Sequence, residues 1–254
     1  MSKGVIRMAA RRRAGCGAWR LALVGMAWAV GHATQVAAEP VGSPAGILKK
    51  GKWVFGLITG GFPARELDDG ADTMLFQIAH YRGYGLTDWL SVYGKLGVAY
   101  LSLNDPLVVK DGGSTTHSFG ANAISGGQVK VKFFESPRHK WEWDGSLQYT
   151  DVRRRNRGTK NEVRFHDWQL ATGLAKSLGK MKPYAGVKVS RSEMAFLIRQ
   201  GGALLKRAEH KPDASLGFYV GADVYLGQYE DVVVNVESGY VDGAEVTVAV
   251  AHSF

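Results

Sequence analysis

The sequence has a single cysteine, Cys16, and only seven prolines among its 254 residues. With one thiol the chain forms no internal disulfide, and it lacks the cysteine pairs of common structural zinc sites. Glycine is abundant at 33 residues, and with so little proline this argues against both a disordered chain and a mainly helical one. The composition therefore favours a β-rich fold that is stable without disulfides.

Long hydrophobic runs are also missing, because after Ala38 no apolar run approaches the roughly 18 residues of a membrane-spanning helix. The apolar run at 21–30 is short and follows a basic segment that contains no acid. Small residues at 36–38 then suit a cleavage site. We predict that residues 1–38 are a cleavable signal peptide and that residues 39–254 are an exported domain. A membrane anchor is the alternative, for which this run is too short.

The formal net charge of +9 partly belongs to that first segment. Six of the 32 lysines and arginines lie in residues 1–38, and none of the 23 acids do, so residues 39–254 carry about +3. The basic balance is therefore partly a targeting feature and not a sign of nucleic-acid affinity. We expect no nucleic-acid partner.

The exported region alternates apolar and polar residues with a period of two, as in a strand whose two faces differ. In residues 216–226 the even positions are apolar, whereas Gly217, Gly221 and Asp223 are among the odd ones. Residues 73–83 are the least clear case, because both faces carry apolar groups. Ten strands are predicted in this way: 53–59, 73–83, 90–100, 119–133, 141–150, 166–178, 183–190, 216–226, 232–240 and 244–254.

Short and long connections alternate strictly between these segments. The short ones have the composition of tight turns, at 85–88, 135–138, 179–182 and 227–230. The others are 60–72, 102–116, 153–161, 191–213 and the brief 241–243. This rhythm predicts a single antiparallel, up-and-down domain with turns at one end and longer loops at the other.

One face of the predicted strands is charged and small, and the opposite face is apolar. Burying many charges in a dry core is prohibitive, whereas paired charges can line a wet lumen. The apolar face then has to contact lipid. We interpret these residues as a charge ladder inside a barrel: Lys95, Lys130, Lys132, Glu142, Asp144, Lys188, Asp223, Glu237 and Glu245.

Taken together, residues 39–254 resemble a bacterial outer-membrane β-barrel protein. Such barrels have an even number of strands, short periplasmic turns, longer outer loops and aromatic girdles. The end of the chain is similar to the assembly signal of this family, in which a terminal Phe follows apolar residues at alternate positions. Here these residues are Val246, Val248, Val250 and Phe254, while His252 departs from the aromatic residue commonly found at that position.

The resemblance implies an all-β, antiparallel, up-and-down transmembrane barrel with ten strands, or alternatively eight or twelve. It also implies a bacterial outer-membrane location, contact with membrane lipid and lipopolysaccharide, and contact of the C-terminal strand with the barrel-assembly machinery. Ten strands leave a lumen that side chains can largely fill. We therefore expect a plugged or narrow barrel.

A basic run follows the fifth predicted strand, in a link expected to be extracellular. Guanidinium groups bind phosphate in a bidentate manner, so the run is a candidate for binding lipopolysaccharide or another polyanion. A solvated loop that only aids solubility is the alternative. The candidate residues are Arg153, Arg154, Arg155, Arg157 and Lys160, and the next long link adds Arg191, Arg199, Lys206, Arg207 and Lys211. Apolar stretches at 194–198 and 203–205 predict strand extensions, a plug or a partner contact.

Proteases and lipid A-modifying enzymes also exist on this architecture, so the histidines bear on function. His166 is adjacent to Asp167 in a predicted strand, and neighbours in a strand point to opposite faces. His80 and His117 lie near predicted loop bases, where Asp68, Asp69 or Asp72 are their candidate partners. No catalytic motif or metal-ligand spacing occurs. We predict a non-enzymatic envelope surface protein without cofactor or metal; a narrow porin-like channel and an outer-membrane hydrolase are the alternatives.

Overall fold

A computed structural model describes residues 46–67, 70–104, 116–155, 162–200, 203–210, 214–226 and 231–254. The predicted signal peptide and the loop residues Arg157 and Lys160 lie outside these described residues. Within the described ranges, no helix is both long enough and apolar enough to cross a membrane.

The described chain is built from strands. Their bounds are β1 Trp53–Glu66, β2 Asp72–Gly85, β3 Leu90–Asn104, β4 Thr116–Ser136, β5 Trp141–Arg155, β6 Glu162–Lys176, β7 Met181–Gln200, β8 Ala203–His210, β9 Ser215–Leu226, β10 Val232–Tyr240 and β11 Ala244–Ser253.

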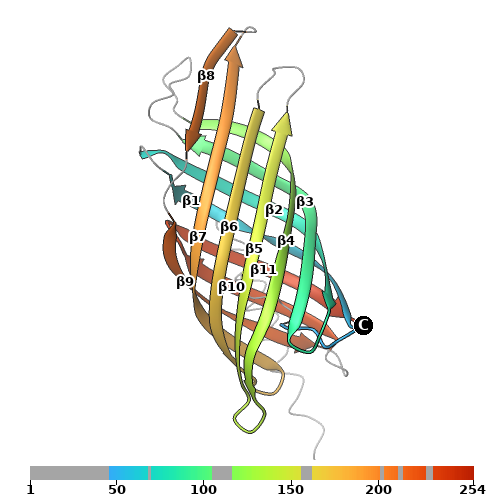
Figure 1. The fold of residues 1–254 in the computed structure, drawn as a ribbon. Coiled ribbons are helices and arrows are strands. Elements are labelled where there is room, and N and C mark those ends of the chain that lie inside the picture. The colour runs from blue at the N-terminus through green and yellow to red at the C-terminus, as the bar shows by residue number, and fades with distance from the viewer. Residues whose placement is uncertain are drawn as a thin grey trace, which may run out of the picture. The chain divides into compact units, whose positions relative to one another are not determined.

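Ten of these strands close into one antiparallel barrel (Figure 1). Strands β1 to β7 pair in sequence order, β7 pairs with β9, and β9 continues through β10 and β11 back to β1. Strand β8 pairs with the outer part of β7 and extends beyond the ring. The prediction of an all-β up-and-down barrel with ten strands in the wall is confirmed.

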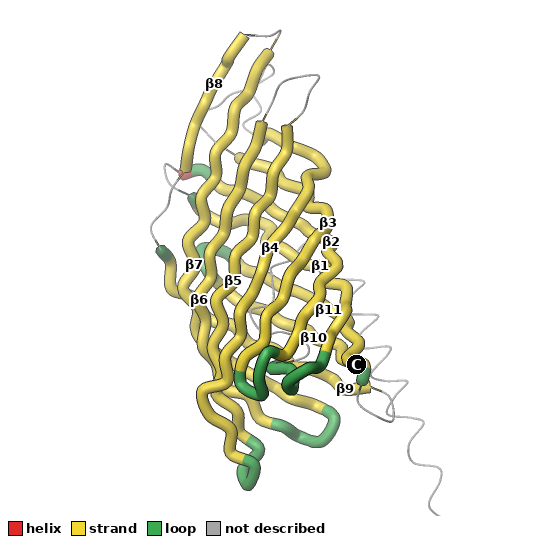
Figure 2. The backbone as a smooth tube through the Cα atoms, turned by 45° about the vertical axis from the view of Figure 1, so that its right-hand side comes forward, coloured by secondary structure: helices red, strands yellow, loops and turns green. Residues whose placement is uncertain are grey.

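Short turns gather at the end of the barrel where the C-terminus lies (Figure 2). By the rule that periplasmic turns are short, this is the periplasmic end. All ten predicted strands are present, but several run further towards the opposite, outer end. Strand β5 continues to Arg155 and β7 to Gln200. Our placement of Arg153 and Arg191 in loops is therefore wrong, and the apolar stretches of the long link extend β7 and form β8.

The two faces of the wall exchange polarity near the outer end. On β6, Trp168 faces outwards and Asp167 inwards, but one pleat further Phe165 faces inwards and His166 outwards. On β7, Val189 is exposed and Ser190 buried, whereas beyond them Arg191 is exposed and Met194 buried. The outer boundary of the membrane is expected where the exterior changes from apolar to charged.

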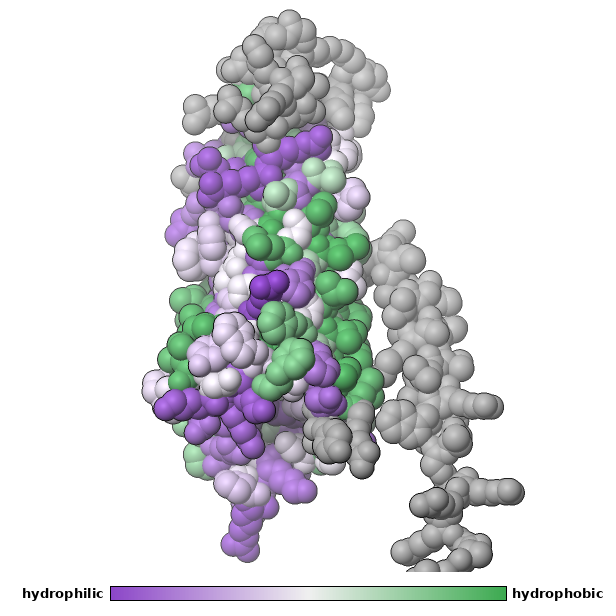
Figure 3. Space-filling model, turned by 90° about the vertical axis from the view of Figure 1, so that its right-hand side faces the viewer, coloured by the Kyte–Doolittle hydropathy of each residue, from purple (hydrophilic) through white to green (hydrophobic). Residues whose placement is uncertain are grey.

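Below this boundary the exterior is apolar. Leu216, Leu96 and Leu170 are exposed over 75%, 69% and 61% of their surface. Figure 3 shows hydrophobic side chains over the middle of the wall and hydrophilic ones towards its ends. Such a band requires lipid, and a closed ring satisfies the backbone hydrogen bonds within it.

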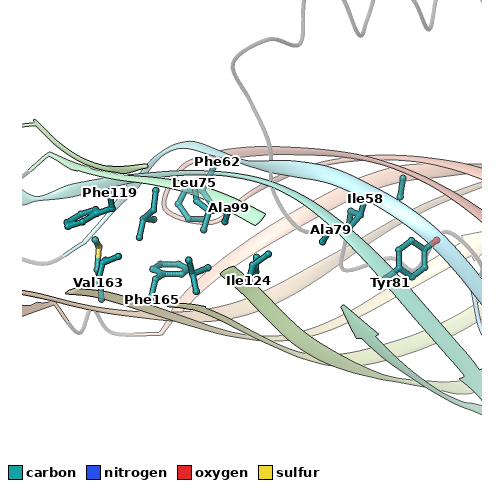
Figure 4. Packing of buried hydrophobic residues seen from close by; sticks show 14 of the residues in the cluster. Ile58, Phe62, Leu75, Ala79, Tyr81, Ala99, Phe119, Ile124, Val163 and Phe165 are labelled. Carbon is teal, nitrogen blue, oxygen red and sulfur yellow. The ribbon is translucent and has the colours of Figure 1, made fainter. Parts of the chain in front are cut away.

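Apolar side chains fill the outer part of the interior. Phe62, Leu75, Phe119, Val163 and Phe165 point towards one another inside the barrel (Figure 4). The expectation of a charged inward face is therefore wrong for this part. Beyond the membrane the exterior meets water, so the wall there packs an apolar core as a soluble barrel does.

Candidate functional site

A buried ion network crosses the lumen beneath the apolar core. Arg65 is 2% exposed, and its two Nη atoms each lie 3.1 Å from a carboxylate oxygen, one of Asp167 and one of Glu245. Ser192 donates a hydrogen bond to Asp167, and Lys188 pairs with Glu245. Because each charge has an opposite partner, the network can exist in a buried interior.

A second group of polar contacts also lines the lumen. Some members are ion pairs and others bind neutral groups. The contacts are Lys182 Nζ to Glu142 Oε1 (3.0 Å), Lys130 Nζ to Asp144 Oδ2 (3.9 Å), Tyr184 Oη to Glu237 Oε2 (2.9 Å), Asn235 Nδ2 to Asp223 Oδ1 (2.7 Å) and Lys95 Nζ to Thr150 Oγ1 (2.8 Å).

The nine predicted ladder residues lie on the inward face, but they do not form one uniform ladder. Lys132, at the periplasmic mouth, binds Glu135 of its own hairpin at 2.7 Å. Sequence reasoning missed two inward cations, Arg65 and Lys182. The alternation of residues 182–188 with a period of two predicts that Lys182 faces inwards. The same alternation does not predict the inward position of Arg65, because the strand register shifts between Phe62 and Arg65.

The segment before β1 lies across the periplasmic mouth of the lumen. Gly46 and Leu48 are buried there. Tyr93 donates a hydrogen bond to the Gly46 carbonyl (2.6 Å), and the Leu48 amide donates to Ser91 Oγ (2.9 Å).

A cavity beside this segment has a volume of only about 10 Å³ and is lined by Gly46, Lys130, Asp144, Gly173, Ala175, Lys182, Tyr184, Tyr219 and Asp223. That is room for about one water molecule. At this place the lumen is nearly filled.

A belt of charged side chains faces outwards on β5, β6 and β7, just beyond the polarity boundary. We call it the outer belt; it comprises Asp151, Arg153, Arg164, His166, Arg191 and Glu193. Asp151, His166 and Glu193 are in register across the three strands, and Arg153 is directly opposite Arg164.

Contacts within the outer belt leave part of its positive charge exposed. Asp151 lies 2.5 Å from Arg153 Nε and 3.0 Å from His166 Nδ1. Arg191 lies 3.3 Å from Glu193. The side chains of Arg153 and Arg191 nevertheless remain 59% and 56% exposed. Three guanidinium groups against two carboxylates leave the belt net positive.

The predicted polyanion residues fall into different places. Arg153 is exposed on the outer face, whereas the neighbouring Arg154 is half-buried on the opposite, inward face of β5. The backbone of Arg155 ends β5, and Arg157 and Lys160 lie outside the described residues. Sequence reasoning missed Arg164, because the predicted strand begins only at residue 166, whereas β6 begins at Glu162.

The histidines do not assemble with Asp72; the other two expected partners, Asp68 and Asp69, lie outside the described residues. His80 faces outwards on β2 and lies eight residues along the strand from Asp72. His117 is buried on the inward face, whereas Asp72 binds Asn104 on the outer face at 3.1 Å. Across the part of the chain that is described, no group of three or more His, Cys, Asp or Glu side chains could hold a metal ion.

The C-terminal strand closes the ring. In β11, Glu245 and Thr247 are buried inside, while Val246, Val248 and Val250 lie on the other face. The Phe254 amide donates a hydrogen bond to the Trp53 carbonyl (3.0 Å), and its ring lies 5.6 Å from that of Phe55.

No protein-family model matches the sequence, and no curated protein matches it. Solved structures do match. The translocator domain of the autotransporter NalP from Neisseria meningitidis aligns over 93% of this chain and 96% of its own, with a TM-score of 0.47 and 9% identity. The outer-membrane protease OmpT from Escherichia coli aligns over 80% and 94%, with a TM-score of 0.42 and 10% identity.

The attachment invasion locus protein Ail of Yersinia pestis aligns over 81% of this chain and 100% of its own, with a TM-score of 0.38 and 10% identity. These similarities concern the fold alone. The closed ring, its lipid-facing exterior and the polarity exchange at the outer end are those of an integral bacterial outer-membrane β-barrel.

Proposed function

We propose that this barrel is a non-enzymatic surface protein of the bacterial outer membrane, exported by cleavage of residues 1–38. Its outer belt binds phosphate groups of lipopolysaccharide or of another external polyanion. The observation that carries the proposal is the direct pairing of Arg153 with Arg164 on the exterior. This pair lies two outward positions beyond the aromatic pair Tyr149 and Trp168, with Asp151 and His166 between them.

The position of this arginine pair is what favours an anionic ligand. Tyr149 and Trp168 lie in contact, with ring centroids 4.4 Å apart, at the level where aromatic residues meet the membrane interface. Like charges directly opposite each other destabilise a sheet, and a phosphate between two guanidinium groups removes that repulsion. Lipid phosphates lie at this depth, so the belt is placed to meet them.

The interior gives less support to the alternative functions. A channel needs a continuous wet path, but apolar side chains fill the outer lumen and the described cavity has room for about one water molecule. A hydrolase needs a base beside a nucleophile, and His80 and His117 face opposite sides of the wall.

A triple substitution tests the proposal. Arg153→Gln, Arg164→Gln and Arg191→Gln together should lower the lipopolysaccharide that the purified barrel retains about tenfold or more, because three charge-assisted contacts are lost. Retained lipopolysaccharide is measured by mass spectrometry of lipid A at low salt.

The matched control is Arg154→Gln, which removes the same kind of charge from the neighbouring, inward position. It should leave retention unchanged. Equal retention by the triple variant and the unaltered barrel would refute the proposal. A loss caused by Arg154→Gln alone would point to net charge, and not to the outer belt, as the cause.

A further inference from the structure

Another exposed arginine, Arg82, lies on the lipid-facing surface, far from the outer belt. Arg82 is exposed on the outer face of β2 and is in register with Phe55 on β1 and Gly94 on β3. Its Nε donates a hydrogen bond to His80 Nε2 (3.1 Å), and its guanidinium carbon lies 5.2 Å from the centre of the Phe55 ring. The guanidinium is thus held in place from two sides.

The depth of Arg82 makes this charge unusual. Tyr84 is the next outward-facing residue towards the periplasm; its ring is tilted against that of Trp53, with the centroids 4.6 Å apart, and belongs to the periplasmic aromatic girdle. Arg82 lies one pleat, about 7 Å along the strand, on the hydrocarbon side of that girdle. Its neighbour His80 is in register with the exposed residues Leu57 and Leu96.

No carboxylate pairs with Arg82 among the described side chains. An arginine on the lipid face destabilises the barrel, most at the bilayer centre and less near the interface, unless its charge is compensated. His80 cannot supply that compensation, because it accepts the hydrogen bond from Arg82 Nε and an imidazole carries no negative charge. The Nη groups of Arg82 remain to bind an anion.

An open trough continues from Arg82 along the same row of the sheet. Gly94 is in register with Gly127 on β4, and both lie on the lipid-facing surface. A methyl group added at Gly94 would meet no atom within 4 Å, and at Gly127 the nearest atom would be a carbonyl oxygen at 3.4 Å. Val92 and Val129 form one side of this trough.

We propose that Arg82 and the Gly94–Gly127 trough bind a phospholipid of the periplasmic leaflet. The phosphodiester accepts hydrogen bonds from the free Nη groups of Arg82, and one acyl chain lies along the trough. Guanidinium binds phosphate strongly in a low-dielectric setting, and the absence of side chains at two adjacent strands lets a chain approach the wall closely. This site is independent of the outer belt.

Phospholipid binding to the delipidated full barrel in detergent tests the proposal, with dioleoyl phosphatidylglycerol as the probe and native mass spectrometry as the readout. Arg82→Gln should weaken binding about tenfold, which is the loss expected of one charge-assisted contact. Gly94→Leu fills the trough without changing charge and should also weaken binding. Arg82→Lys should retain part of the affinity.

The matched control is Arg153→Gln, which lies in the outer belt and should leave phospholipid binding unchanged. Conversely, Arg82→Gln should not alter lipopolysaccharide retention, so the failure of either proposal is distinguishable from that of the other. If Arg82→Gln binds the probe as the unaltered barrel does, the proposal is overturned. It is also overturned if Gly94→Leu binds normally but changes the oligomeric state, since the trough would then contact a second copy.

Discussion

Arg65 shows how much of the fold can depend on one buried residue. Its side chain joins β1 to Asp167 of β6 and to Glu245 of β11, which lie on different sides of the lumen. Removal of one partner from a buried ion pair leaves an uncompensated charge and typically costs about 3–5 kcal/mol. Arg65→Leu should therefore lower the urea midpoint for unfolding from lipid vesicles.

A second substitution separates lost charge balance from lost packing. Asp167→Asn combined with Arg65→Leu removes the carboxylate that is left alone, while Glu245 keeps Lys188 as its partner. The double variant should recover part of the stability. If Arg65→Leu unfolds at the same urea concentration as the unaltered barrel, the network is not what stabilises the lumen.

At this scale the sequence predicts a residue's face only where the period of two is unbroken. Lys188 and Glu245 follow that period and lie on the predicted face. Arg65 does not, because a register shift in β1 turns it inwards. The partners of a buried charge are harder to predict than its face. Asp167 and Arg65 are 102 positions apart in the sequence, and only closure of the ring brings them together.

The C-terminal strand is the element on which closure depends. Phe254 is 58% exposed, so its ring adds little burial to the folded barrel, yet its backbone bonds to Trp53. Phe254→Ala keeps those backbone bonds and removes the predicted assembly signal. We expect a lower amount of barrel in the outer membrane of cells, with less than about 1 kcal/mol lost from the stability of refolded protein.

Phe133→Ala is the control for this element, because Phe133 is also exposed, at 55%, near the same end of the barrel. It should leave cellular assembly unchanged. Heat-modifiable migration in detergent gels, compared between membrane fractions and refolded samples, measures both effects. Equal loss of assembly in the two variants would show that aromatic surface in general, and not the C-terminal position, matters.

Strand positions follow from the sequence, but strand ends do not. Within the membrane the apolar residues face lipid, as Trp168 and Leu170 do on β6. Beyond it the apolar residues face inwards, as Val163 and Phe165 do. The backbone pairing of the strands continues past the membrane boundary, although there the apolar side chains turn from the outer to the inner face. A prediction that assumes apolar residues always face outwards therefore ends each strand too early. The outer belt is hidden for the same reason.

The molecule as a whole has two barriers along its axis. The apolar core blocks the outer half, and the segment containing Gly46 and Leu48 lies across the periplasmic mouth. Because the two barriers lie in series, each one alone is enough to block ion flow. Opening one of them therefore leaves the lumen blocked by the other. We expect no stable conductance steps from the unaltered barrel in a planar bilayer, and none when residues 46–50 alone are deleted.

Conduction should appear only when both barriers are opened. Deletion of residues 46–50 combined with Phe165→Ala and Phe196→Ala removes the periplasmic segment and two large side chains of the outer core. A wet path then reaches the charged network, and Lys188→Gln in that background should shift the ion selectivity towards cations, because a positive charge is lost. Heat-modifiable migration checks that the variant is still closed. Steps from the unaltered barrel that Lys188→Gln changes would instead favour a native channel and count against a filled lumen.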